Sequence, residues 1–140
     1  MGVILDTGFF FALKIKKDKN HENSKIILKK LLNKIYRPII TTDLVVNETY
    51  SLVNIRTKNN KSAIEKFNDL FWGKERFFDI IKIDINEYRY IANIMNKYST
   101  QKRILSFVDA SLIYIGKKFK YNLIISFDEH FDGIFQRISI

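Results

Sequence analysis

The chain has 140 residues, 46% of them hydrophobic, and its 24 Lys and Arg against 15 Asp and Glu give a formal charge of +9. This composition predicts one folded domain over residues 1–140 with an ordinary packed core, and excludes a disordered chain. The absence of cysteine excludes disulfides and thiolate metal sites and is typical of a reducing cytosol, so we expect a cytoplasmic protein. No apolar run approaches the roughly 18 residues that cross a bilayer, and no basic region precedes the apolar N-terminal stretch, so we expect neither a membrane span nor a signal peptide.

The positive charge has two interpretations. It favours an anionic partner such as nucleic acid, but solvated lysines in a protein rich in Lys, Ile and Asn would produce the same excess. Charge alone therefore does not choose a function.

Short apolar runs alternate with segments whose apolar residues have helical spacing. In chain order we expect a strand at 2–5, a helix from about residue 9, a helix at 21–35, a strand at 38–42, helices at 43–56 and 62–72, a strand at 79–83, helices at 85–98 and 106–119, a strand at 122–127 and a fifth strand at 137–140. Short apolar strands separated by helices predict an α/β fold with a parallel sheet covered on both faces.

Helix starts are predicted from capping residues. Asp43 is the expected N-cap of its helix, and three pairs fit the capping-box pattern, namely Ser62 with Glu65, Asp84 with Glu87, and Ser106 with Asp109. We expect the segment STQKRIL, at 99–105, to be extended and to cross a face of the domain.

Four acidic residues fall where a parallel sheet would bring them to one edge. Asp6 and Asp128 directly follow strands, and the carboxyl ends of parallel strands share an edge where sites form. Glu48 lies early in the helix that leaves the second strand, and its helical neighbours are mostly apolar. Asp109 lies in the first turn of the helix that leads to the fourth strand. Together these acids predict one site.

Each acid also has a structural interpretation. Asp6 or Thr7 can cap a helix, Ser106 and Asp109 can form a capping box, Asp128 can cap a short turn, and Glu48 can form a lone buried ion pair. Four carboxylates gathered at about 5 Å would repel by roughly 3 kcal/mol per pair, so a shared edge requires a cation.

The donor chemistry indicates which cation. Carboxylate oxygens suit Mg²⁺ or Mn²⁺. Zinc does not fit, because only His21 and His130 supply nitrogen and we expect both at the surface.

The segments ILDTGFFFAL, VVNETYSLV, SFVDASLI and LIISFDEHFD, in this order and spacing, resemble the motifs of PIN-domain nucleases, and are most similar to the small prokaryotic group that includes VapC-like toxins. The resemblance covers essentially the whole chain. It implies a three-layer α/β/α domain, Mg²⁺- or Mn²⁺-dependent endoribonuclease activity on RNA, a homodimer, and a small antitoxin as partner.

Carried over by position, the family's catalytic and metal-binding acids are Asp6, Glu48, Asp109 and Asp128. Ser126 matches a small hydroxyl residue that would orient a carboxylate or a water. Gly8 stands where Asn or Ser is frequent in the family, so one side chain is missing. Asp132 is expected at the surface.

The mechanism that this resemblance implies uses the carboxylates to hold the metal, and Glu48 or Asp109 to accept a proton from the attacking water. Lys102 and Arg103 are the expected phosphate contacts, because they lie just before the helix that carries Asp109.

Three other protein classes share single features with this sequence but do not fit it. An aspartic protease shares the DTG triplet but requires a mostly β chain, a nucleotide-binding ATPase requires a glycine-rich phosphate loop, and a receiver domain requires paired acids after its first strand. Within the PIN-like group, a housekeeping RNA-processing nuclease and a non-catalytic module that binds RNA or protein stay open.

Overall fold

Five parallel strands form the centre of the fold in this computed structural model, which describes residues 1–138. They are β1 (Val3–Leu5), β2 (Ile39–Thr42), β3 (Asp79–Ile81), β4 (Leu123–Ile125) and β5 (Gln136–Arg137), in the spatial order β3-β2-β1-β4-β5. The central strand β1 pairs in parallel with β2 and β4 and is fully buried. Its uninterrupted apolar sequence is what a strand covered on both faces requires.

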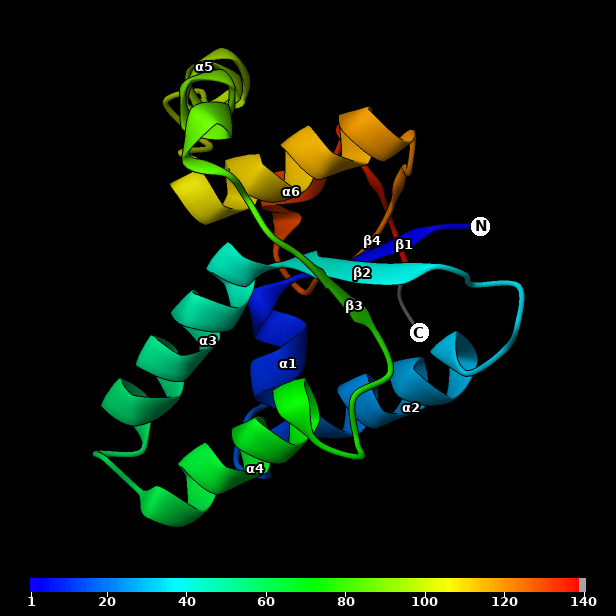
Figure 1. Cartoon of the computed structure of the whole chain (residues 1–140), viewed down its shortest axis with the longest axis vertical. Coiled ribbons are helices and arrows are strands. Elements are labelled where there is room, and N and C mark those ends of the chain that lie inside the picture. The colour runs from blue at the N-terminus through cyan, green and yellow to red at the C-terminus, as the bar shows by residue number, and fades with distance from the viewer. Residues whose placement is uncertain (139–140) are drawn as a thin grey trace.

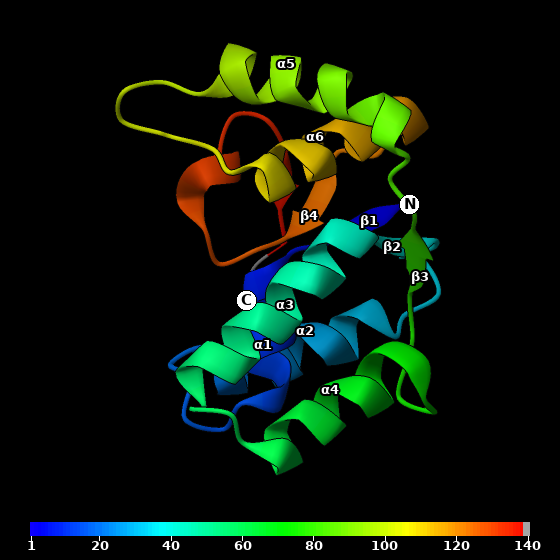
Figure 2. The ribbon, with the colours of Figure 1, turned by 60° about the vertical axis from the view of Figure 1, so that its left-hand side comes forward.

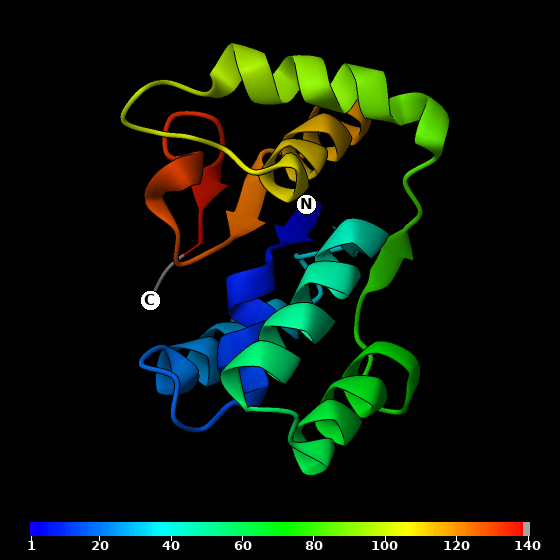
Figure 3. The ribbon, with the colours of Figure 1, turned by 90° about the vertical axis from the view of Figure 1, so that its left-hand side faces the viewer.

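Helices cover both faces of this sheet, as Figures 1 and 3 show. The helices are α1 (Thr7–Lys14), α2 (His21–Leu31), α3 (Asp43–Arg56), α4 (Lys61–Trp72), α5 (Tyr88–Tyr98) and α6 (Phe107–Phe119), with short 3₁₀ turns η1 (Ile85–Glu87) and η2 (Glu129–Phe131). Helices α5 and α6 lie on one side of the sheet and α1 to α4 on the other (Figure 1). The expected three-layer α/β/α architecture with a central parallel sheet is therefore confirmed.

The layer of α1 to α4 is held by a buried aromatic cluster. The ring of Phe10 lies 5.2 Å from that of Phe71 and 4.8 Å from that of Phe78, measured between centroids. Phe10 follows the end of β1 by a few residues, so this packing fixes the direction in which the chain leaves the sheet. The start of α1, where Asp6 lies, is consequently rigidly placed.

Two helix caps differ from the predictions. Helix α3 is capped by Thr42, whose side chain accepts the Val45 N–H, and not by Asp43. The carboxylate of Asp43 instead accepts the N–H of Ile83 at 2.9 Å, which ties α3 to the segment after β3.

The cap of helix α4 lies two residues earlier than predicted. Asn60, and not the pair Ser62 and Glu65, caps it by accepting the Ala63 N–H at 3.0 Å. The predicted contact between Asp84 and Glu87 is present, since the Asp84 N–H donates to the Glu87 carboxylate at 3.0 Å.

Some element lengths also differ. Helix α2 ends at Leu31 and not at residue 35, and β3 ends at Ile81 and not at residue 83. Strand β5 covers Gln136–Arg137, whereas a strand was expected at 137–140, so the two share only Arg137. Residues 139–140 lie outside the described part of the chain.

The prediction for residues 99–105 is wrong. The segment folds into a tight turn in which Thr100 and Arg103 exchange backbone hydrogen bonds of 2.8 and 3.1 Å. Helices α5 and α6 are packed against each other and run in opposite directions, as Figure 2 shows. Since α5 already ends near the start of α6, the chain needs no extended crossing to bring Asp109 to its place.

In the described residues, no helix is both long and apolar enough to span a bilayer.

Candidate active site

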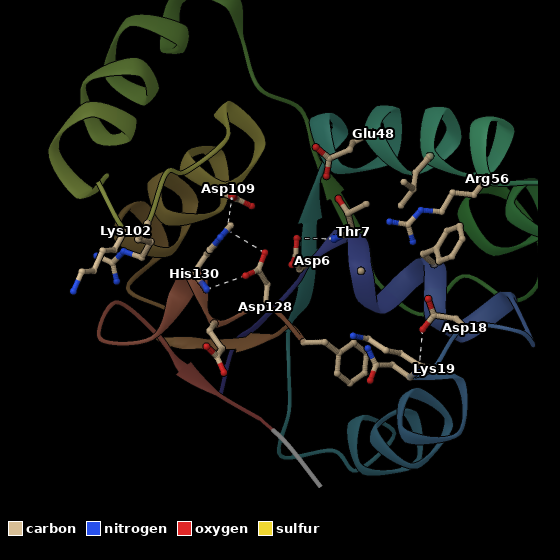
Figure 4. Close-up of a pocket in the computed structure, with 17 residues that line it drawn as sticks. Asp6, Thr7, Asp18, Lys19, Glu48, Arg56, Lys102, Asp109, Asp128 and His130 are labelled. Carbon is tan, nitrogen blue, oxygen red and sulfur yellow. Dashed lines mark hydrogen bonds and ion pairs between the residues drawn. The ribbon is translucent and has the colours of Figure 1, made fainter. Parts of the chain in front are cut away.

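A cavity of about 750 Å³ opens where β1 and β4 end, and all four of the predicted acids line it (Figure 4). Leu5 is paired with Ile125 in the parallel register of these strands, and the Asp6 N–H continues the ladder to the Ile125 carbonyl at 3.2 Å. The residues that follow the two strands therefore emerge side by side. Asp6 and Asp128 are brought together by this register.

Asp6 is both a helix cap and a site residue. One carboxylate oxygen accepts the Thr7 N–H at 2.7 Å, and the other accepts the Ser126 hydroxyl at 2.7 Å. Burial raises the pKa of Asp6 to about 7, the Ser126 hydrogen bond opposes this shift, and the negative charges of Asp109 and Glu48 add to it. A buried carboxylate of this kind is costly as an anion and gains from a nearby cation.

Asp109 also combines the two roles. Its backbone N–H donates to the Ser106 hydroxyl at 3.0 Å, and its carboxylate accepts the Ser106 N–H at 3.1 Å, so the predicted capping box is present. The same carboxylate lines the cavity, and burial raises its pKa. Because α6 begins at the carboxyl edge of the sheet, its first turn places a cap residue inside the site.

His130 was expected at the surface, and its side chain is 41% exposed, but it also lines the cavity beside two of the acids. Its Nδ1 lies 3.1 Å from a carboxylate oxygen of Asp128 and 3.7 Å from one of Asp109, as Figure 4 shows. The other carboxylate oxygen of Asp128 accepts the backbone N–H of His130 at 3.0 Å, and this hydrogen bond caps the turn η2. The sequence signal that could have predicted this position of His130 is the D-x-H spacing shortly after a strand. A tight turn there can direct the Asp and His side chains toward the same edge of the sheet. His21 is structural, with its Nδ1 2.7 Å from the Ala12 carbonyl.

Glu48 enters the site from the other layer. It is half-buried on α3, lines the cavity, and its charge adds to the raised pKa of Asp6. Figure 4 shows it facing Asp6 and Asp109 across the cavity. The site is thus assembled from four segments that are distant in sequence.

The two basic residues expected to contact phosphate differ in their surroundings. Lys102 is exposed at the cavity rim. Arg103 also lines the cavity, but its guanidinium donates to the carbonyls of Asp132 at 2.8 Å and Tyr98 at 3.2 Å, which braces the turn. These hydrogen bonds favour a structural role for Arg103, whereas Lys102 is more available to contact phosphate.

Two further residues from the motifs are placed as follows. A Cβ at Gly8 would meet no atom within 4 Å, so the side chain that is frequent there in the similar family would project into open space beside the cavity. Asp132 is exposed and pairs with Arg137 at 2.6 Å, outside the cavity lining.

The donor set fits a hard divalent cation. Six acidic residues line the cavity, the four predicted acids together with Asp18 and Glu129, and they are joined by the single imidazole of His130. Zinc sites instead usually combine several nitrogen or sulfur ligands. Within residues 1–138, no three acidic or histidine side chains are already gathered at metal-binding distance.

Ser126 contacts two of the acids that line the cavity, and its removal tests whether it positions them. Its hydroxyl donates to Asp6 and accepts the Asp128 N–H at 3.0 Å, so it holds two acids of the site. We expect Ser126→Ala to weaken Mn²⁺ binding by about tenfold, as is typical when a residue that orients a ligand is lost. Calorimetric titration measures this. Ser24→Ala, which removes an equally buried hydroxyl bonded to the His21 carbonyl, is expected to leave Mn²⁺ affinity unchanged.

Comparisons with known proteins agree with this architecture. The family model described as the PIN domain matches residues 3–134. Among solved structures, the chain is similar to Mycobacterium tuberculosis VapC20, a Sarcin-Ricin loop cleaving toxin, with a TM-score of 0.79 and 19% identity over 99% of each chain. It is also similar to FitAB bound to an IR36 DNA fragment, with a TM-score of 0.68 and 15% identity over 97% of this chain and 93% of that one. No curated protein matches the sequence.

Proposed function

This chain belongs to the PIN-domain family, and from that premise we propose that it is a metal-dependent endoribonuclease that acts as the toxin of a toxin–antitoxin pair. The observation that carries this proposal is the gathering of Asp6, Glu48, Asp109 and Asp128 around one cavity with a basic rim. A binding surface for RNA has no use for four mutually repelling acids at its centre. A site that holds a divalent cation beside a phosphodiester requires such acids.

The chain's own residues have distinct roles in this proposal. Asp6, Asp109 and Asp128 would hold Mg²⁺ or Mn²⁺, with Glu48 facing them across the cavity. When bound, the ion would supply charge neutralisation at the scissile phosphate and would acidify a water. Ser126 holds Asp6 in position, and Lys102 contacts a neighbouring phosphate.

We assign proton acceptance to Glu48. The carboxylate oxygens of Asp6 are hydrogen-bonded to Thr7 and Ser126, and the Asp109 carboxylate accepts the Ser106 N–H. Glu48 is not used as a cap, and this leaves its carboxylate available to a water in the cavity.

Cleavage of RNA with and without metal tests the activity. The purified protein is expected to cut single-stranded RNA in Mg²⁺ or Mn²⁺ and to lose all cleavage in a chelator. Cleavage that persists at full rate in the chelator would contradict the proposed use of a metal. Salt-dependent RNA binding without cleavage in either metal would favour the non-catalytic module.

The biological role and the assembly are separate parts of the proposal. We propose a small antitoxin partner encoded immediately upstream, which the structural likeness to the toxin VapC20 and to FitAB favours, and, independently of that likeness, a homodimer. Expression of the chain alone is expected to arrest growth, and co-expression of the upstream reading frame is expected to restore it. Absence of arrest with an active enzyme would favour a housekeeping RNA-processing role. Sedimentation of the purified protein tests the dimer.

A further inference from the structure

A second cavity, of about 480 Å³, adjoins the active-site cavity. It is formed by the end of α1, the linker that follows it, and the turn between α3 and α4. Both cavities are lined by Phe11 and Arg56, so they meet at these two residues.

The charge of this second cavity is uniformly positive. Six of its twelve lining residues are Lys or Arg and none is acidic; they are Lys14, Lys16, Lys17, Arg56, Lys58 and Lys66. Among the described residues, only Lys14 of these six has an ion pair, with Glu75 at 2.9 Å. The other five are exposed at the surface. Such a group of unneutralised cations in a concave surface attracts a polyanion.

Arg56 lies at the junction of the two cavities. Its guanidinium lies over the ring of Phe11, 5.0 Å from the centroid, and both residues line both cavities. Figure 4 shows Arg56 and Lys102 on opposite sides of the four acids. A strand that crosses the acids therefore has a cation on each side.

We propose that this surface, formed by Phe11, Lys16, Lys17, Arg56, Lys58 and Lys66 and called here the α3–α4 groove, binds the phosphate backbone of single-stranded RNA that extends out of the active-site cavity. The proposal rests on the proposed function, since it extends the path of the same substrate. The apolar residues that line the groove, Phe11, Ile15 and Ala63, are buried or half-buried, and its exposed charged side chains are all cations. Positively charged grooves of this kind bind single strands along their phosphate backbone. The groove adjoins the proposed site for a phosphodiester, which favours RNA over an acidic polypeptide.

Two triple variants with equal net charge test the location. Lys16→Gln, Lys17→Gln and Lys58→Gln together remove three charges from the α3–α4 groove. The control carries Lys29→Gln, Lys34→Gln and Lys82→Gln, which removes three charges from exposed positions outside both cavities. Circular dichroism confirms that both variants fold.

The readout is binding of a fluorescent, unstructured RNA of about 20 nucleotides in a chelator, with an oligonucleotide of about 4 nucleotides for comparison. We expect the groove variant to bind the long RNA about 10–100-fold more weakly, with a salt slope smaller by about 2, since each neutralised phosphate contributes about 0.7. The control variant is expected to lose less than about threefold. The short oligonucleotide is expected to distinguish the two variants far less.

Because cleavage is not needed for this readout, the two proposals fail separately. Loss of binding confined to the groove variant supports the groove even if no RNase activity is found. Equal losses in both variants, wild-type affinity in the groove variant, or no RNA binding by the wild type would each overturn it. So would a groove variant that keeps RNA but no longer binds polyglutamate, since that result assigns the groove to an acidic protein.

Discussion

Asp6→Asn and Asp109→Asn are each expected to lower RNA cleavage by at least about 100-fold. Both carboxylates line the cavity, and an amide has nearly the same shape but lacks the negative charge that holds a divalent cation. A catalytic cation supplies several kcal/mol of charge stabilisation, and each 1.36 kcal/mol corresponds to a factor of ten in rate. Single-turnover cleavage of a labelled RNA at saturating enzyme measures this loss.

The matched control is Asp79→Asn. Asp79 is exposed at the start of β3, hence at the opposite edge of the sheet, and its replacement is expected to leave the cleavage rate unchanged. RNA affinity in a chelator is expected to stay the same or rise slightly in the two site variants, because each removes a negative charge that faces phosphate. Wild-type cleavage by both site variants would place the RNase activity outside this cavity.

The same Asp6→Asn substitution is expected to raise the thermal stability of the metal-free protein at pH 8. The pKa of Asp6 is about 7 in the folded protein and 3.8 as the reference value. Below pH 3.8 the carboxyl is protonated in both states and burial carries no charge penalty. Above pH 7 the carboxyl is ionised in both states, and the folded state then bears the full free-energy cost of burying the charge. A pKa raised from 3.8 to about 7 corresponds to a cost of up to about 4 kcal/mol. Asn has no such penalty at any pH.

The measurement is the difference in melting temperature between Asp6→Asn and wild type, followed from pH 5 to pH 8. It is expected to grow with pH and to reach several degrees at pH 8. Mn²⁺ is expected to raise the melting temperature of the wild type and to close the gap, since a ligand that binds only the folded state stabilises it. A difference that does not depend on pH would mean that hydrogen bonds from Thr7 and Ser126 already satisfy the charge.

Much of the site could be predicted from the sequence because its logic is local. The apolar strands that end before Asp6 and Asp128, and the capping pattern of Ser106 with Asp109, each occupy a few consecutive residues. Apolar periodicity and turn chemistry act over that range, and the shared edge of parallel strands then joins the separate predictions. The structural and the functional interpretation of a cap turned out not to compete, since Asp6 and Asp109 are caps whose carboxylates line the cavity.

What the sequence could not determine is how distant segments approach one another. Thr42 caps α3, and the carboxylate of Asp43 instead accepts the backbone N–H of Ile83, 40 residues later. His130 joins the site because the turn after β4 directs it between Asp109 and Asp128.

The basic residues show the same limit. Arg103 follows Lys102 directly, yet it is taken up by the carbonyls of Asp132 and Tyr98, which only the packed chain brings within reach. Arg56 lies at the active-site cavity because α3 packs against α1 and its guanidinium covers Phe11. The amino-acid sequence thus determined the fold class and the four acids through short-range periodicity and capping. Tertiary packing alone decided which other side chains lie beside these four acids, because those contacts depend on long-range burial that no local pattern encodes.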